Sequence, residues 1–190
     1  MAFPTPALHR HAERVLCYLL ATRHLGLRYT ADQEDVHGFT DSDWGVERST
    51  SGQVFQYCQA AISWGSKRQT SVALSSCEAE IVAASEASKE AVYLATFLED
   101  KLGVRPRDEP VTLDCDNQGA IDVAYNPEHF NRMKHVQRRH FFVRELVEEN
   151  RITVPYVRSA ENIADLFTKP LAYAAFRPLR DRIMNCSGVT

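Results

Sequence analysis

The 190-residue chain lacks a paired set of cysteines, and this absence excludes two classes of small stabilised domain. Its five cysteines are scattered, and no two of them form a Cys-x-x-Cys pair. They are Cys17, Cys58, Cys77, Cys115 and Cys186. The sequence therefore supports neither a disulfide framework nor a structural zinc site, and reduced thiols in an intracellular compartment are the simpler interpretation.

Long apolar runs and a strong charge of one sign are also missing. No apolar run approaches the roughly 20 residues that a membrane-spanning helix needs, so we expect no membrane association. Charged residues interrupt the first apolar stretch at His9, Arg10, Glu13 and Arg14, which argues against a signal peptide. The net charge of −3 argues against indiscriminate coating of nucleic acid, although a local basic patch would suffice to contact phosphates.

What is present is the composition of a globular protein, with 44% hydrophobic and 25% charged residues. Apolar spacing predicts helices over about 6–24, 75–101, 117–125, 134–149 and 173–184, and a further helix capped by Ser159 that carries Ile163, Leu166 and Phe167. Strands are predicted from about 36, at 53–57 and 60–64 as a hairpin, and at 111–115 and 152–157. Clustered strands followed by helix–strand alternation predict an α/β fold with a mixed sheet, antiparallel first and parallel afterwards.

Three acidic residues stand at the ends of predicted elements. Asp41 lies on the first strand, where it shares one face with Phe39 and Asp43. Asp116 ends the strand that begins at Val111, and Asp165 lies in the first turns of the helix that follows the last strand.

A fourth acid has to be chosen between Glu78 and Glu80, which cannot point the same way on one helix. Glu80 lies in line with Ala84, Ala87 and Ala91, a small-residue face suited to packing on a sheet, whereas Glu78 lines up with a more polar face. Glu80 is therefore the acid predicted to look inward.

Such a group of acids is what metal-assisted phosphodiester chemistry requires. Two divalent ions roughly 3.5–4 Å apart activate water and stabilise the leaving oxygen, and Mg²⁺ prefers carboxylate and phosphate oxygens as ligands. Spacing alone does not establish the site, because the chain has 25 acidic residues and most of them must be solvated surface charges.

Five motifs, in order across residues 38–171, carry a resemblance to a known family. They are Gly-Phe-Thr-Asp-Ser-Asp-Trp at 38–44, Ser-Thr-Ser-Gly at 49–52 with Ala-Ile-Ser-Trp at 61–64, Val-Ala-Leu-Ser-Ser-Cys-Glu-Ala-Glu at 72–80, Cys-Asp-Asn-Gln at 115–118, and Ala-Asp-Leu-Phe-Thr-Lys-Pro-Leu at 164–171. Together they resemble the RNase H domain of copia-type retrotransposon Pol polyproteins. The set is specific, although each short motif would be weak alone.

The resemblance implies an RNase H-like fold, with a five-stranded mixed sheet flanked by helices, and hydrolysis of the RNA strand of RNA/DNA hybrids with two Mg²⁺ or Mn²⁺ ions. It implies that Asp41, Glu80, Asp116 and Asp165 are the catalytic and metal-binding acids, with Asp43 as a reserve ligand. A cytoplasmic location in a virus-like particle, or a nuclear one, would follow.

The segment before residue 31 resembles the last helix of a reverse transcriptase, and the sequence contains no Tyr-x-Asp-Asp polymerase motif. We therefore divide the chain into a reverse transcriptase remnant (1–30), an RNase H domain (31–172) and a C-terminal helical tail (173–190). The reverse transcriptase domain of the same polyprotein is the expected protein partner.

One departure from related enzymes concerns a helper histidine. Many cellular RNases H carry a His in the loop before the last catalytic Asp, but here that loop is Arg158-Ser-Ala-Glu-Asn-Ile-Ala. His135 or His140 would be the substitute, although a solvated surface position is the more common role of a helix histidine. The usual Lys-His-Ile-Asp segment of the family reads Lys134-His-Val-Gln.

Basic and polar residues near these motifs are predicted to contact the hybrid. The predicted contacts are Lys67, Arg68, Asn117, Gln118, Arg132, Lys134, Arg138 and Arg139. The basic residues would contact phosphates and the two amides ribose hydroxyls, whereas a solvated helix face and helix capping are the alternatives. Trp64 is expected in the core, and Trp44 is a candidate for stacking.

Two other functions compete with an active hybrid-specific nuclease. A non-catalytic binding module of the same fold would follow if the altered segment at 134–141 reflects decay or recruitment by a host. A DNA-cutting integrase of the same broad fold fits worse, because integrases use three acids with a different spacing.

Overall fold

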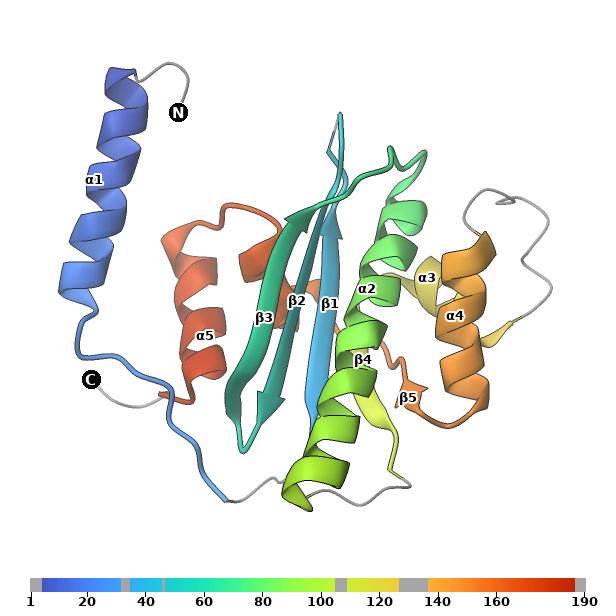
Figure 1. Ribbon diagram of the computed structural model, residues 1–190. Helices are drawn as coiled ribbons and strands as arrows, with labels where there is room; N and C mark the ends of the chain where they lie inside the picture. The colour runs from blue at the N-terminus through green and yellow to red at the C-terminus, as the bar shows by residue number, and fades with distance from the viewer. Residues whose placement is uncertain (1–4, 32–34, 46, 105–108, 127–136, 187–190) are drawn as a thin grey trace.

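A five-stranded mixed sheet forms the centre of the computed structural model (Figure 1), which describes residues 5–31, 35–45, 47–104, 109–126 and 137–186, without the side chains of 137, 138 and 140. Its strands are β1 (His37–Asp43), β2 (Thr50–Tyr57), β3 (Ala60–Arg68), β4 (Val111–Cys115) and β5 (Ile152–Thr153), in the spatial order β3-β2-β1-β4-β5. The first three strands pair antiparallel, and β4 and β5 add parallel to β1. The predicted fold class is therefore confirmed.

The helices fall close to the predicted ranges. They are α1 (Pro6–Ala21), α2 (Ser76–Phe97), α3 (Gln118–Tyr125), α4 (Gln137–Glu148) and α5 (Tyr173–Met184). The helix predicted to end near residue 101 finishes instead as a π-helical turn, η1 (Leu98–Leu102), and Gly103 closes it with φ 63°, a left-handed conformation that glycine adopts without a steric penalty.

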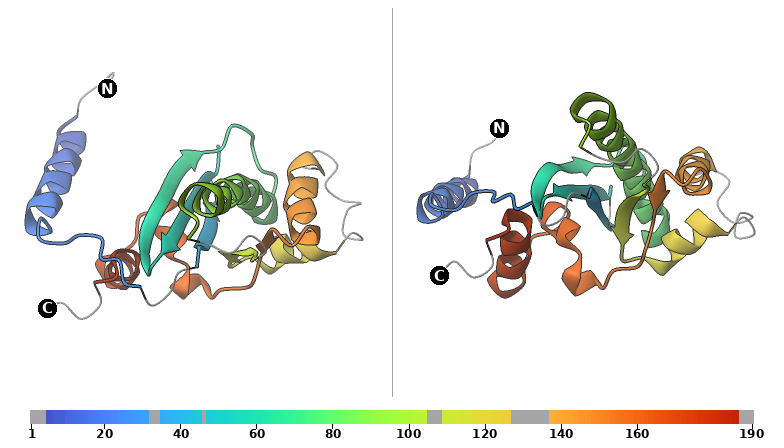
Figure 2. Two further views of the ribbon diagram at one scale, coloured as in Figure 1. Left: turned by 60° about the horizontal axis from the view of Figure 1, so that its bottom comes forward. Right: turned by 90° about the horizontal axis from the view of Figure 1, so that it is seen from below.

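Two apolar clusters cover the two faces of the sheet (Figure 2). Phe55, Leu113 and residues of α2, α3 and α4 pack on one face, and the alternate residues Phe39 and Val54 pack against Ile163 and α5 on the other. This alternation follows from the two-residue period of a strand. The strand predicted at 152–157 is shorter than expected, because after Thr153 only an isolated bridge from Cys115 to Tyr156 continues the pairing.

The start of α2 is fixed by local capping. The side chain of Ser75 accepts a hydrogen bond from the backbone N–H of Glu78, and the Glu78 carboxylate accepts one from the backbone N–H of Leu74. Ala84, Ala87 and Ala91 are buried, so the small-residue face that carries Glu80 does pack on the sheet. Glu78 is buried as well, so its face is less polar than the sequence pattern indicated.

Two predictions about local structure are wrong. Instead of a helix capped by Ser159, the chain forms two 3₁₀ turns, η3 (Ser159–Glu161) and η4 (Ile163–Phe167), and Asn162 caps the second by accepting a hydrogen bond from Ala164 N. Trp64 is 58% exposed rather than in the core, because β3 is an edge strand.

The helix α1 stands away from the rest of the protein (Figure 1) and has no buried residue. Its contacts include an edge-to-face packing of Tyr18 on Phe176 of α5. The following segment is tied down more firmly, since the Tyr29 hydroxyl donates to Ala61 O and Thr30 N donates to Cys58 O. Among the described residues, no helix combines the length and apolar character that crossing a membrane would require.

Candidate active site

Three of the four predicted acids converge at one end of the central strands β1 and β4. The parallel pairing of β1 and β4 aligns Thr40 with Cys115, so the next residues, Asp41 and Asp116, lie side by side at the carboxyl ends of both strands. Glu80 comes from the first turns of α2. One oxygen of each carboxylate lies within 4.8 Å of the others, a grouping that could hold a metal ion.

Burial raises the pKa of two of these carboxylates, Glu80 and Asp41. Burial, with the charge of Asp41, raises the pKa of Glu80 to about 8. Burial also raises the pKa of Asp41 to about 6, although a hydrogen bond from Thr168 and the charge of Lys169 oppose the rise. A divalent cation would remove this cost by pairing with the charged forms.

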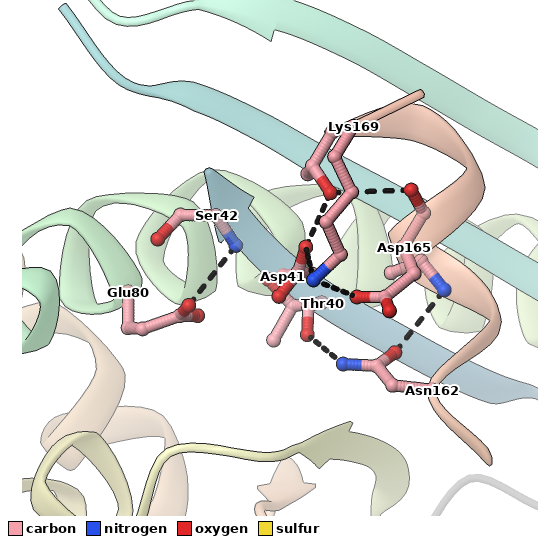
Figure 3. A network of polar contacts seen from close by, with 9 residues as sticks. Thr40, Asp41, Ser42, Glu80, Asn162, Asp165 and Lys169 are labelled. Atoms are coloured by element: carbon pink, nitrogen blue, oxygen red, sulfur yellow. Dashed lines mark hydrogen bonds and ion pairs between the residues drawn. The ribbon is translucent and has the colours of Figure 1, made fainter. Parts of the chain in front are cut away.

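The hydrogen bonding of Glu80 also favours a bound cation. Glu80 Oε1 accepts a hydrogen bond from the backbone N–H of Ser42 at 3.1 Å (Figure 3), whereas Oε2 is buried and has no hydrogen-bond partner among the described residues. Buried acceptors are normally satisfied. The donor set of three carboxylates therefore fits a hard divalent cation such as Mg²⁺ or Mn²⁺.

The fourth predicted acid, Asp165, lies on the opposite side of Asp41 and is engaged by a lysine (Figure 3). Lys169 Nζ lies 2.8 Å from Asp165 Oδ1 and 3.8 Å from Asp41 Oδ2. Burial acts to lower the pKa of Lys169, but the hydrogen bond with Asp165 and the negative charges of Asp41 and Asp165 raise it overall. The lysine therefore carries its charge.

Two further contacts attach the η4 turn to β1. Thr168 Oγ1 donates a hydrogen bond to Asp41 Oδ2, and the fully buried Asn162 donates from Nδ2 to Thr40 O at 2.9 Å. The sequence reasoning missed Asn162, Thr168 and Lys169 as parts of the site. The available signal was the spacing of Asp165 and Lys169, an acid followed by a base four residues later.

Predicted substrate contacts flank a cavity of about 470 Å³ between β3, α2 and α4. Its charged lining consists of Lys67, Arg68, Lys89 and Arg139 with Glu86 and Glu90. Arg68 pairs with Glu47 at 2.9 Å, and Arg139 donates to Ser71 Oγ at 3.4 Å. The cavity thus brings together three of the predicted basic contacts.

The predicted amide contacts have structural partners. Asn117 caps α3 by accepting a hydrogen bond from Ala120 N, and the exposed Gln118 donates to Asp122 at 2.9 Å. Trp44 is 55% exposed, and its indole N–H donates to Ala73 O. Arg132, Lys134 and His135 lie outside the described residues, as do the side chains of Arg138 and His140.

The strand order and the position of the acids define a class of fold. The N-terminal RNase H domain of a Mycobacterium tuberculosis protein superposes on 77% of this chain with a TM-score of 0.52 and 14% identity, and 96% of that domain is covered. A foamy viral protease–reverse transcriptase, solved in complex with an RNA/DNA hybrid, matches 90% of this chain and 21% of its own length with a TM-score of 0.50 and 17% identity. The chain has an RNase H-like fold.

Sequence similarity identifies the family more narrowly. The retrovirus-related Pol polyprotein from transposon TNT 1-94 of Nicotiana tabacum is 36% identical over 82% of this chain and 12% of its own length. The corresponding protein from transposon RE1 of Arabidopsis thaliana is 32% identical over 96% of this chain and 13% of its length. Over most of its length, the chain is therefore homologous to the retrovirus-related Pol polyproteins of copia-type transposons. It spans about an eighth of the length of these relatives, and no family model matches it.

A different kind of relative matches half of the chain. The secreted RxLR effector protein 161 of Plasmopara viticola is 44% identical over 96 residues, which are 48% of this chain and 68% of that protein. Part of this sequence therefore also resembles a protein that is not named as a polyprotein.

Proposed function

We propose that the domain hydrolyses the RNA strand of RNA/DNA hybrids, as the RNase H part of a retrotransposon reverse transcriptase. The observation that carries this proposal is the convergence of Asp41, Glu80 and Asp116 within 4.8 Å on an RNase H-like sheet. These acids come from three separate segments, and burial raises the pKa values of two of them. Such a cluster costs folding free energy unless it serves a bound cation.

In this proposal the three carboxylates would hold a Mg²⁺ or Mn²⁺ ion, and Asp165 would help Asp41 to hold a second ion. The ions would supply activation of water and stabilisation of the leaving oxygen. The backbone N–H of Ser42 orients Glu80, and the Thr168 hydroxyl orients Asp41, so both carboxylates are aimed before any ion arrives. No protein nucleophile is needed.

The substrate side of the proposal rests on the basic residues around the cavity. Lys67, Arg68 and Arg139 would pair with backbone phosphates, a contact that does not depend on base sequence and weakens with salt. The amides of Asn117 and Gln118 follow Asp116 directly and would contact ribose 2′-hydroxyls, which distinguish RNA from DNA.

We also propose that residues 31–172 are the RNase H domain and that residues 1–30 belong to the reverse transcriptase that precedes it, with 173–190 as a tail. The absence of buried residues in α1 supports this division. The protein partner would be that reverse transcriptase, and the location cytoplasmic or nuclear.

The test is cleavage of an end-labelled RNA/DNA hybrid with Mg²⁺ or Mn²⁺, alongside RNA/RNA and DNA/DNA duplexes. Wild-type protein should cut only the RNA of the hybrid, whereas Asp41→Asn and Asp116→Asn should not cut it. Glu161→Gln, which changes an exposed acid near the site, should match wild type. Equal activity in wild type and either aspartate variant would refute the proposal.

A binding module without catalysis is the second candidate, favoured by the match of half the chain to an RxLR effector. It predicts hybrid binding or protein binding with no cleavage under any divalent ion tested. The same assay, combined with a binding measurement in EDTA, separates the two functions.

A further inference from the structure

The carboxylates on the two sides of Asp41 differ in whether a basic side chain pairs with them. On one side, Glu80 and Asp116 form no ion pair with a lysine or arginine among the residues that the structure describes. On the other side, Lys169 contacts both Asp165 and Asp41. The side chains of Asp165 and Asp41 are only 10% and 4% exposed, so water screens these charges weakly.

The ammonium of Lys169 therefore lies where a bridging cation between Asp41 and Asp165 would have to bind. A divalent ion at that point would stand within a few ångströms of a positive charge, and like charges at such distances repel strongly in a poorly hydrated site. The lysine side chain is 37% exposed and has a flexible four-carbon stem, so it has room to swing toward solvent.

We infer that Lys169 is the resident cation of the Asp41–Asp165 pair, so that the cluster takes one divalent ion readily at Asp41, Glu80 and Asp116 and a second only by displacing this ammonium. The inference rests on the metal site of the proposed function and adds an order of occupancy to it. Lys169 acts through the two aspartates and is thus a positioning residue. When no second ion is bound, the ammonium of Lys169 balances the negative charge of Asp41 and Asp165.

The experiment is a Mn²⁺ titration of the full chain without nucleic acid, in which binding is measured by calorimetry and by electron paramagnetic resonance. Wild type should show one tight site and one weaker site. Lys169→Met should tighten the second site at least tenfold and leave the first within about twofold, because only the competing charge has been removed. Lys169→Arg, which keeps the charge, should retain the weak second site.

Two controls make the result decisive. Lys89→Met removes a lysine that also pairs with a carboxylate, Glu86 at 2.9 Å, but on the exposed face of α2, and should leave both sites unchanged. Lys169→Gln is a second neutral variant, to be used if the Met variant does not fold by circular dichroism. Equal second-site affinity in wild type and a folded neutral variant would overturn the inference.

The outcome also separates this inference from the proposed function. Absence of the first site in wild type, or an unchanged first site in Asp116→Asn, contradicts the metal site itself. An intact first site with a second site that does not respond to Lys169 contradicts only the role of the lysine.

Discussion

Glu80 and Asp165 flank the same carboxylate, Asp41, yet their surroundings are opposite. One oxygen of Glu80 accepts a hydrogen bond from the backbone N–H of Ser42, and the other is buried without a hydrogen-bond partner among the described residues. Burial raises the pKa of Glu80 to about 8. Asp165 has an ammonium at 2.8 Å and a turn that is hydrogen-bonded to β1 through Asn162. Glu80 therefore has no neutralising lysine or arginine among the described residues, whereas Lys169 neutralises the Asp165 side of the cluster.

The largest expected effect is on hybrid cleavage, when Glu80 and Asp165 are substituted one at a time. Glu80→Gln should lower hybrid cleavage by about a thousandfold, because it removes a direct ligand worth several kcal/mol in the transition state. Asp165→Asn should lower it by about 10–100-fold, since the first ion position remains. Both rates come from single-turnover cleavage in Mg²⁺. Equal losses would mean that the two sides are equivalent.

The second prediction concerns how the stability of the metal-free protein depends on pH, because the raised pKa of Glu80 makes that stability pH-dependent. The pKa of Glu80 is raised from 4.5 in the unfolded chain to about 8 in the folded protein. Between these values the folded protein holds a proton that the unfolded chain releases. The free energy of unfolding is therefore highest below about pH 4.5 and falls as the pH rises to 8. Metal-free wild type should lose a few kcal/mol of unfolding free energy across that window.

Urea unfolding in EDTA at several pH values measures this loss. Glu80→Gln should flatten the profile, and Asp41, whose pKa is raised to about 6, accounts for the slope that remains. Saturating Mn²⁺ should reverse the trend, since ligands must be deprotonated to bind the ion. A wild-type profile as flat as that of Glu80→Gln would contradict the raised pKa.

The third prediction weakens only the Asp165 side. Asn162→Ala removes the buried hydrogen bond to Thr40 O and the cap of η4, and should destabilise the fold by about 2 kcal/mol in urea unfolding. Its Mn²⁺ affinity at the first site should stay near that of wild type. Asn126→Ala, an exposed position at the end of α3, should change stability by less than about 0.5 kcal/mol.

The smallest effect concerns the hydroxyl that touches Asp41. Thr168→Val removes its hydrogen bond to the carboxylate while keeping the shape of the side chain, and should cost about 1 kcal/mol or less. The pKa of Asp41 should rise further, because that bond favours the charged form. The pH midpoint of Mn²⁺ binding reports the change, and Thr168→Ser should restore the wild-type midpoint.

Much of the fold was predictable because its signals are local. Period-two and period-3.6 patterns located the strands and most helices, and the helical phase separated Glu80 from Glu78. The prediction failed where tertiary contacts override local pattern. The chain around Asn162 forms short 3₁₀ turns because Asn162 hydrogen-bonds to Thr40, a residue 122 positions earlier, and no local window contains that partner.

The candidate site was predictable as a set of acids but not as an arrangement. Parallel pairing of two strands could be expected to bring Asp41 and Asp116 together. The ion pair of Asp165 with Lys169 could not be expected, since the position of the Lys169 ammonium depends on how the η4 turn docks against β1. Trp64 shows the same limit, because an alternating apolar pattern does not reveal which strand lies at the edge of the sheet.

The position of β1 in the middle of the sheet has a consequence for the order of folding. Its antiparallel neighbour β2 follows within a few residues, whereas its parallel neighbour β4 aligns residue 112 with residue 37 and requires closure of a long loop. We therefore expect the hairpin-connected strands to assemble early and the contacts that are remote in sequence to form late. A chain that has folded only its first three strands would carry Asp41 without Asp116, so we expect the candidate ion site to form only when β4 joins the sheet.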